Sequence, residues 1–193
     1  MKYLKLFKKE DTLLKDVLII TRFKDYLNET NINNDNIWYH GSKIKFDKFK
    51  LKQGTLFDID YTSPIFLTSN INFAKAYAGD YTPYIYTIKL LTDNIMDFRK
   101  LPEEYDIKED DIIANNLINF IYDNWDNTKY NFYWGYPEKC YSNLLSGEYS
   151  EVERTWVYDW LKLNNFDGAY LIETGELNVL IFDESSIEIL EII

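Results

Sequence analysis

The feature that most restricts how this chain of 193 residues can fold is the run Leu177–Phe182 (LNVLIF), where all but one side chain is apolar. A short apolar run next to a turn signal predicts a strand buried on both faces, which must lie between two other strands. Glu173-Thr174-Gly175-Glu176 reads as a hairpin-type turn before it, and it connects back to a strand at Ala169–Ile172. Ile187–Ile192 alternates Ile and Glu and predicts an edge strand with one solvated face. The C-terminal region therefore predicts three strands with short connections.

The upstream sequence predicts further strands and helices in an order that does not alternate regularly. We expect strands at Ile37–His40, Ile65–Thr68 and Tyr84–Leu91; a helix over 70–78, with Ser69 as N-cap and Gly79 at its end; a helix in 110–125; and a helix opened by the capping box Ser150/Glu153 and running to about Leu163. Residues 53–64 carry turn signals and predict a loop. This order predicts an α+β fold with a mostly antiparallel sheet.

Composition suggests how the domain is bounded. Residues 1–36 predict an N-terminal helical extension, because apolar residues recur at helical spacing up to residue 27 and an Asn-rich linker follows. Residues 37–193 predict the main domain, with 102–147 as a helical and aromatic insertion. The aromatic residues of 130–141 read either as a lid packed on the core or as an exposed surface for a ligand or partner.

Charge and residue usage exclude several classes of function. Residues 1–52 carry 12 basic and 7 acidic side chains, whereas the remaining 141 carry 9 basic and 25 acidic ones, giving a net charge of −11. This acidic balance disfavours nucleic acid as a partner. One Cys and one His leave no internal disulfide, and we expect no metal site. No apolar run is long enough for a membrane span and no signal peptide is evident, so we expect a cytoplasmic protein or one delivered into a host cytoplasm. The sequence has no GxGxxG, no P-loop and no GxSxG motif.

The stretch Trp38-Tyr39-His40-Gly41-Ser42 holds the single histidine. A lone histidine is most often structural. Here apolar and aromatic residues precede it, as in a buried strand, and the following glycine lets a ligand or another backbone approach closely. His40 is therefore the first candidate for a functional residue.

Three motifs resemble the diphtheria-toxin and poly-ADP-ribose-polymerase branch of the ADP-ribosyltransferases. They are Tyr39-His40-Gly41-Ser42, Pro64–Tyr77 (PIFLTSNINFAKAY) and Asn178–Asp183 (NVLIFD). Together with Tyr86–Asn94 and Phe166-Asp167-Gly168, they are also similar to small ADP-ribosyltransferase-like domains of bacteria and phages. The resemblance covers about residues 37–100 and 150–193. It implies small antiparallel sheets split around an NAD cleft.

The resemblance also implies roles for individual residues, with NAD as substrate. His40 would hydrogen-bond a ribose hydroxyl, and the Gly41 backbone would hold the nicotinamide carboxamide. Tyr77 would stack on the nicotinamide ring, Phe66 would form an aromatic wall, and Ser42 would lie near the adenosine.

The catalytic carboxylate is the unresolved part of the resemblance. Asn178 occupies the position of the family's glutamate, and a neutral amide stabilises a developing cation less well than a carboxylate does. Glu176 lies two residues earlier, so on an extended strand it faces the same side and is the first alternative. Glu173 and the loop acids Asp58 and Asp60 are weaker ones.

Three functions stay open. The resemblance implies a mono-ADP-ribosyltransferase that modifies a protein or small-molecule acceptor, with protein favoured over nucleic acid. The second possibility is a catalytically degenerate module that binds NAD, ADP-ribose or a protein partner. The third is an unrelated α+β interaction module.

Overall fold

The structure is a computed structural model that describes residues 36–56, 59–79, 84–127, 130, 136–147, 151 and 155–193. These residues belong to one compact unit, Ile32–Ile193. The expected N-terminal helical extension lies outside the described residues, except for Asn36. So do residues 131–135 of the aromatic segment 130–141 and both ends of the expected capping box, Ser150 and Glu153. Those expectations stay predictions.

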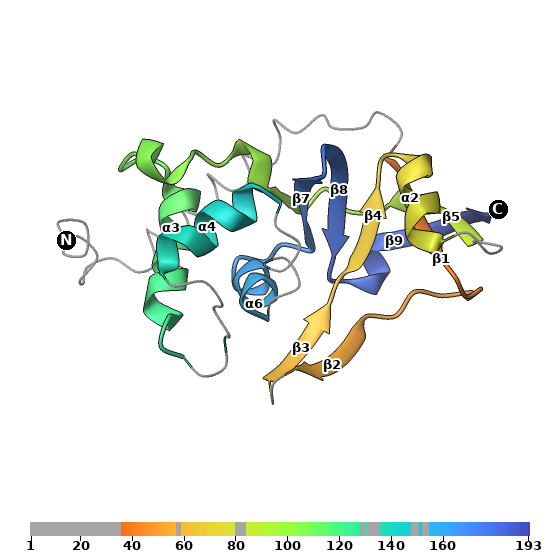
Figure 1. Ribbon diagram of the computed structural model, residues 1–193, viewed down its shortest axis with the longest axis horizontal. Helices are drawn as coiled ribbons and strands as arrows, with labels where there is room; N and C mark the ends of the chain where they lie inside the picture. The colour runs from red at the N-terminus through yellow and green to blue at the C-terminus, as the bar shows by residue number, and fades with distance from the viewer. Residues whose placement is uncertain are drawn as a thin grey trace. The chain divides into compact units, whose positions relative to one another are not determined.

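The fold is mixed α+β and is built on a seven-stranded sheet in the order β6-β7-β8-β4-β1-β5-β9 (Figure 1). Neighbouring strands are antiparallel, except that β6 and β7 are parallel. The strands are β1 (Ile37–Ser42), β4 (Ile65–Thr68), β5 (Tyr84–Leu90), β6 (Ile95–Asp97), β7 (Gly168–Glu173), β8 (Glu176–Ile181) and β9 (Ile187–Ile192). The mostly antiparallel α+β prediction is confirmed, and β6 is a strand that the sequence pattern did not indicate.

The C-terminal strands follow the hydrophobic pattern closely. Asn178 to Ile181 of β8 are buried, and β8 lies between β4 and β7, as an apolar run requires. β9 forms one end of the strand order. Thr174 and Gly175 have φ values of 50° and 85°, so the two-residue turn between β7 and β8 has the positive-φ geometry of a tight hairpin.

Helix α2 (Ile71–Ala78) lies beside β1 and β4 (Figure 1). Its N-cap is Asn70, whose side chain accepts a hydrogen bond from the Asn72 N–H, so the prediction of Ser69 is wrong by one residue. The reason is that Ser69, directly after β4, is still tied to the neighbouring strand, since its N–H donates to the Leu177 carbonyl at 3.0 Å. Gly79 ends the helix with φ 78°, as expected.

The loop predicted over 53–64 is wrong. Strands β2 (Lys52–Leu56) and β3 (Ile59–Ser63) form a separate two-stranded antiparallel sheet in this region. Because these strands pair with each other and not with the large sheet, the hydrophobic pattern of a central strand is absent from their sequence.

Three further α-helices are described: α3 (Ile112–Asn124), α4 (Pro137–Leu145) and α6 (Thr155–Leu163). In Figure 1, α3 and α4 lie together, beyond β7 and away from α2. Ile113, Leu117 and Ile121 repeat every four residues, and all three are buried on one side of α3. The described part of 102–147 adds helices and no strand, so the sheet comes from the regions before and after it.

The main core lies on the face of the sheet opposite α2. Its large side chains include Trp38, Phe49, Tyr86 and Tyr170, with the Trp38 and Tyr170 rings stacked at 5.6 Å. A smaller cluster of Ala74, Ala78 and Ile85 joins α2 to the sheet.

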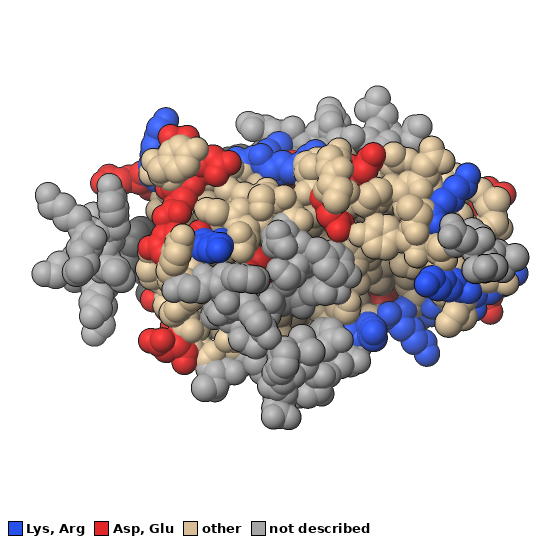
Figure 2. Space-filling view, in the orientation of Figure 1, with Lys and Arg blue, Asp and Glu red and all other residues tan. Residues whose placement is uncertain are grey.

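Charge is distributed unevenly over the described surface. The lysines that follow β1 are all exposed: Lys43, Lys45, Lys48, Lys50 and Lys52. On the face in Figure 2, acidic side chains gather over the helical side at the left, and several basic ones lie toward the right. No helix among the described residues is long and apolar enough to cross a membrane.

Candidate functional site

The large sheet is interrupted between β1 and β4. Strand β1 pairs with β5 at six consecutive positions, from Ile37↔Lys89 to Ser42↔Tyr84. With β4 it shares a single pair, Tyr39↔Thr68, while β4 pairs with β8 along its whole length. The sheet therefore divides beyond Tyr39 into a β6-β7-β8-β4 part and a β1-β5-β9 part, and the two edges at this division are available for other contacts.

The backbone of Gly41 faces this division. Its register partner on β5, Ile85, uses both its N–H and its C=O in hydrogen bonds with Ile193, at 2.9 and 2.8 Å. In a strand, the N–H and C=O of one residue point to the same side, so the groups of Ile85 point away from β1. The N–H and C=O of Gly41 consequently point away from β5, toward β4.

Gly41 also brings α2 close to the sheet. A Cβ atom built on Gly41 would lie 1.8 Å from the Ala74 carbonyl oxygen and 3.1 Å from the Ala78 Cβ. No side chain fits there, so the absence of a Cβ lets α2 lie against β1. The glycine thus has a packing role that is separate from any contact with a ligand.

His40 crosses the division from β1 to β4. Its Nδ1 is 2.8 Å from the Phe66 carbonyl oxygen, and its ring contacts Phe49 edge-on at a centroid distance of 5.0 Å. Burial lowers the pKa of His40 below its usual 6.5, and the hydrogen bond to Phe66, which raises the pKa, offsets this only in part. His40 is therefore neutral at pH 7.

The tautomer of His40 follows from its partner. A carbonyl oxygen can only accept, so Nδ1 carries the proton and donates to Phe66. In a neutral ring the other nitrogen, Nε2, is then an acceptor. His40 can thus receive a hydrogen bond from a hydroxyl group through Nε2.

A hollow lies at this division, with about 350 Å³ of empty space including its open mouth. Four of the residues that the resemblance assigns to binding line it: His40, Gly41, Phe66 and Tyr77. The other lining residues are Tyr39, Leu67, Thr68, Phe73, Ala74, Glu173 and Asn178. Much of this space is open solvent at the mouth, so the enclosed part is smaller than a complete small-molecule site and suits at most one ring-sized part of a ligand.

Two side chains from the β7–β8 hairpin form the polar wall of the hollow. Glu173 accepts a hydrogen bond from the Tyr77 hydroxyl at 2.9 Å through Oε1, and one from Asn178 Nδ2 at 3.0 Å through Oε2. Asn178 is 3% exposed, and its Oδ1 has no hydrogen-bond partner within the described part of the chain. A buried amide oxygen without a partner is costly, so a donor supplied by a ligand would stabilise it.

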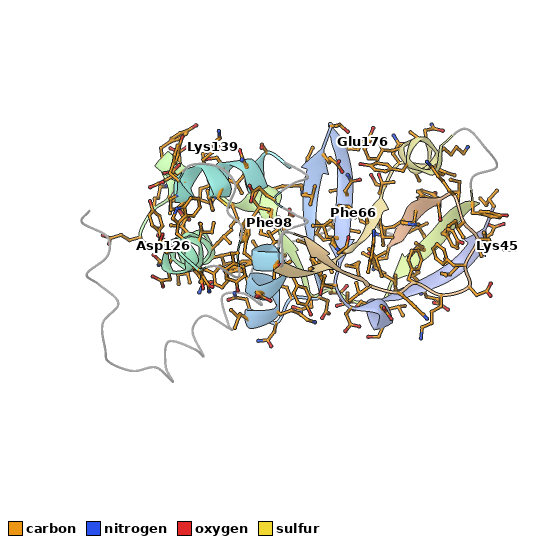
Figure 3. All side chains as sticks on the ribbon, turned by 60° about the horizontal axis from the view of Figure 1, so that its bottom comes forward. Lys45, Phe66, Phe98, Asp126, Lys139 and Glu176 are labelled. Atoms are coloured by element: carbon orange, nitrogen blue, oxygen red, sulfur yellow. The ribbon has the colours of Figure 1, made fainter. Side chains whose placement is uncertain are left out.

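Two of the predicted site residues are not among those that line the hollow. Glu176 lies at the start of β8 (Figure 3), where its Oε1 accepts a hydrogen bond from Asn70 Nδ2 at 2.9 Å. Ser42 is engaged locally: its hydroxyl donates to the Ile44 carbonyl at 2.8 Å and accepts from the Ile44 N–H. Asp58 lies outside the described residues, and the side chain of Asp60 is not described.

Glu173 lines the hollow, whereas sequence reasoning ranked it below Glu176. The hairpin register pairs Glu173 with Glu176 and Leu171 with Asn178, so Glu173 and Asn178 are diagonal neighbours on one face of the sheet. The two-residue turn was visible in the sequence and could have given this register. Phe73, four residues before Tyr77 on α2, was another visible neighbour, and the two rings lie 5.2 Å apart.

The described residues contain no group of three or more His, Cys, Asp or Glu side chains that could hold a metal ion. Comparison with protein-family models, with curated proteins and with solved structures finds no significant match.

Proposed function

We propose that this domain is an ADP-ribosyltransferase-like enzyme that binds NAD at the division of the sheet and transfers one ADP-ribose group to an acceptor. The observation that carries the proposal is the hollow between β1 and β4, where His40, Gly41, Phe66 and Tyr77 meet from three separate segments. The residue roles and the NAD-binding cleft are those that the resemblance implies, and NAD is a substrate here.

The backbone of Gly41 supports this proposal by its direction. A primary carboxamide has one C=O acceptor and an NH₂ donor, and it needs one donor and one acceptor side by side. The N–H and C=O of Gly41 provide such a pair on the edge that faces β4. The nicotinamide carboxamide would bind there like a short piece of an added strand.

The side chains support it by their chemistry. Neutral His40 offers Nε2 as an acceptor for a ribose hydroxyl, because its Nδ1 proton is held by Phe66. Phe66, Phe73 and Tyr77 line the hollow, and a flat pyridinium ring can stack on an aromatic side chain. The hollow would take only the nicotinamide end at its open mouth, while the rest of NAD would extend over the surface.

A binding module without catalysis is the second candidate, and Asn178 favours it. A neutral amide stands where the resemblance expects a glutamate, and a single lost stabilising group costs about 10²–10³ in rate. In this case the cleft would bind NAD or ADP-ribose without breaking a bond.

One experiment tests both candidates. The purified chain is incubated with NAD, alone and with cell lysate, and we follow free nicotinamide, label transferred to macromolecules and the NAD-induced shift in melting temperature. The enzyme predicts nicotinamide release, whereas the binding module predicts a thermal shift without release. If neither nicotinamide release nor a thermal shift is observed at millimolar NAD, both candidate functions are refuted.

A matched pair of variants tests the position of the site. Tyr77 and Tyr105 are both exposed, at 53% and 84%, but only Tyr77 lines the hollow. We expect Tyr77→Ala to abolish the NAD-induced thermal shift and Tyr105→Ala to retain it. Equal shifts in the two variants would contradict the assignment of this hollow.

A further inference from the structure

Building on the proposed function, we propose that Glu173, at the end of β7, is the carboxylate that acts on NAD, and that Asn178 and Tyr77 are its positioning residues. The resemblance puts the acidic residue on β8, at Asn178, with Glu176 on the same strand as the substitute. The structure instead brings a carboxylate to the hollow from the neighbouring strand.

The hydrogen bonds of Glu173 fix where its charge lies. Asn178 Nδ2 donates to Oε2 at 3.0 Å, and the Tyr77 hydroxyl donates to Oε1 at 2.9 Å. These partners come from β8 and from α2, on two different walls of the hollow. Both oxygens are thereby held at the polar end of the site, beside the proposed nicotinamide-binding surface.

Glu176 is the natural competitor, and its contacts give it a different role. Its Oε1 accepts from the side chain of Asn70, the N-cap residue of α2. It therefore connects the hairpin to the beginning of that helix, and it is not among the residues that line the hollow. Glu173 and Glu176 flank the same two-residue turn, but only Glu173 reaches the site.

An amide at position 178 is consistent with a catalytic carboxylate on β7 in place of one on β8. Two carboxylates at the 3.0 Å separation of Asn178 and Glu173 could not both ionise at neutral pH. Asn178 donates a hydrogen bond to Glu173, where a glutamate carboxylate would repel it. The Asn178–Glu173 pair thus has a single negative charge, which lies on β7 and not on β8, where the resemblance would put it.

The proposed chemical step is cleavage of the bond between nicotinamide and ribose. The bond between C1′ of the ribose and the nicotinamide nitrogen breaks, and its electron pair goes to that nitrogen, which releases neutral nicotinamide. The Glu173 carboxylate opposes the positive charge that develops on the ribose. An acceptor O–H or N–H, or water, forms the new bond to C1′, and its proton passes to Glu173 and then to solvent.

Tyr77 links binding to this step. Its hydroxyl donates to Oε1 of Glu173, and its ring lies half-exposed on α2. A ribose hydroxyl would replace the tyrosine hydroxyl at Oε1 when NAD binds, while the Asn178 contact at Oε2 is retained.

The test compares Glu173→Gln with Glu176→Gln, the same change three residues apart in one hairpin. Single-turnover nicotinamide release and the NAD-induced thermal shift are measured for both variants and the unaltered chain. We expect Glu173→Gln to lose about 10²–10³ in release rate with its thermal shift retained, and Glu176→Gln to stay within a few-fold. Glu173→Ala serves as a second variant, because added formate should restore part of its activity and should not affect Glu173→Gln.

The outcomes separate the two proposals. Release by the unaltered chain and by Glu173→Gln at similar rates would overturn the role of Glu173 and leave the enzyme intact. A loss in Glu176→Gln equal to that in Glu173→Gln would also overturn it. No release by the unaltered chain would refute the enzymatic function, and the role of Glu173 would fall with it.

Discussion

Gly41→Ala tests how closely helix α2 and the site depend on one another. The added Cβ would start 1.8 Å from the Ala74 carbonyl oxygen, whereas ordinary contact begins at 3.4 Å, so the strand and helix must separate by about 1.6 Å. The clash is with backbone, and no change of rotamer relieves it. Ala74 and Ala78, which anchor α2 to the sheet, would both be displaced.

The cost can be estimated from related substitutions. Overpacking of a core typically costs about 1–3 kcal/mol, and a backbone clash belongs at the upper end. Replacing glycine with alanine also lowers the conformational entropy of the unfolded chain, which stabilises the folded state by about 0.4–1 kcal/mol. We therefore expect a net loss of about 2 kcal/mol in the free energy of unfolding, or a drop of about 4–8 °C in melting temperature for a chain of this size.

The assay is urea denaturation, combined with hydrogen exchange of the α2 amides. Gly175→Ala is the control: its Cβ meets nothing within 4 Å, and its φ of 85° makes alanine unfavourable by about 1 kcal/mol. Only Gly41→Ala should speed exchange in α2 and, if NAD binds at the hollow, weaken that binding. A Gly41→Ala variant within about 0.5 kcal/mol of the unaltered chain, with α2 exchange unchanged, would refute the reasoning.

Two further predictions concern protons. The pKa of His40 is lower in the folded chain than in the unfolded chain, so the unfolded chain binds more protons and stability should fall as the pH drops from 6.5 toward that lower pKa. An NMR titration of this single histidine should give a midpoint below pH 6.5. A midpoint at or above 6.5 would contradict the neutral ring. Asn178→Asp places a second carboxylate against Glu173, which raises the pKa of the pair, so the folded state binds more protons than the unfolded one. The variant should lose about 1–3 kcal/mol at pH 7, with a smaller loss at pH 5 in urea denaturation; an equal loss at both pH values would argue against the pairing.

Local sequence signals were sufficient for much of the sheet and for one end of α2. The apolar run of β8, the alternation of β9 and the turn at Thr174-Gly175 each follow from short-range rules, since side-chain period and positive φ are set within a few residues. Gly79 at the end of α2 was predicted for the same reason. The β2–β3 hairpin was missed, because a small separate sheet lacks the apolar pattern of a central strand.

The site depended on contacts that no local pattern contains. His40, Gly41, Phe66 and Tyr77 were all found from the sequence, but the division of the sheet that brings them together depends on how β4 divides its pairing between β1 and β8. The contact of Glu173 with the hollow likewise depends on the position of α2, since Tyr77 and Glu173 lie 96 residues apart in the chain. The sequence by itself thus determined which side chains are available, because strand period and turn geometry are local. Only the tertiary structure decided which carboxylate faces the hollow, because that depends on how distant segments pack.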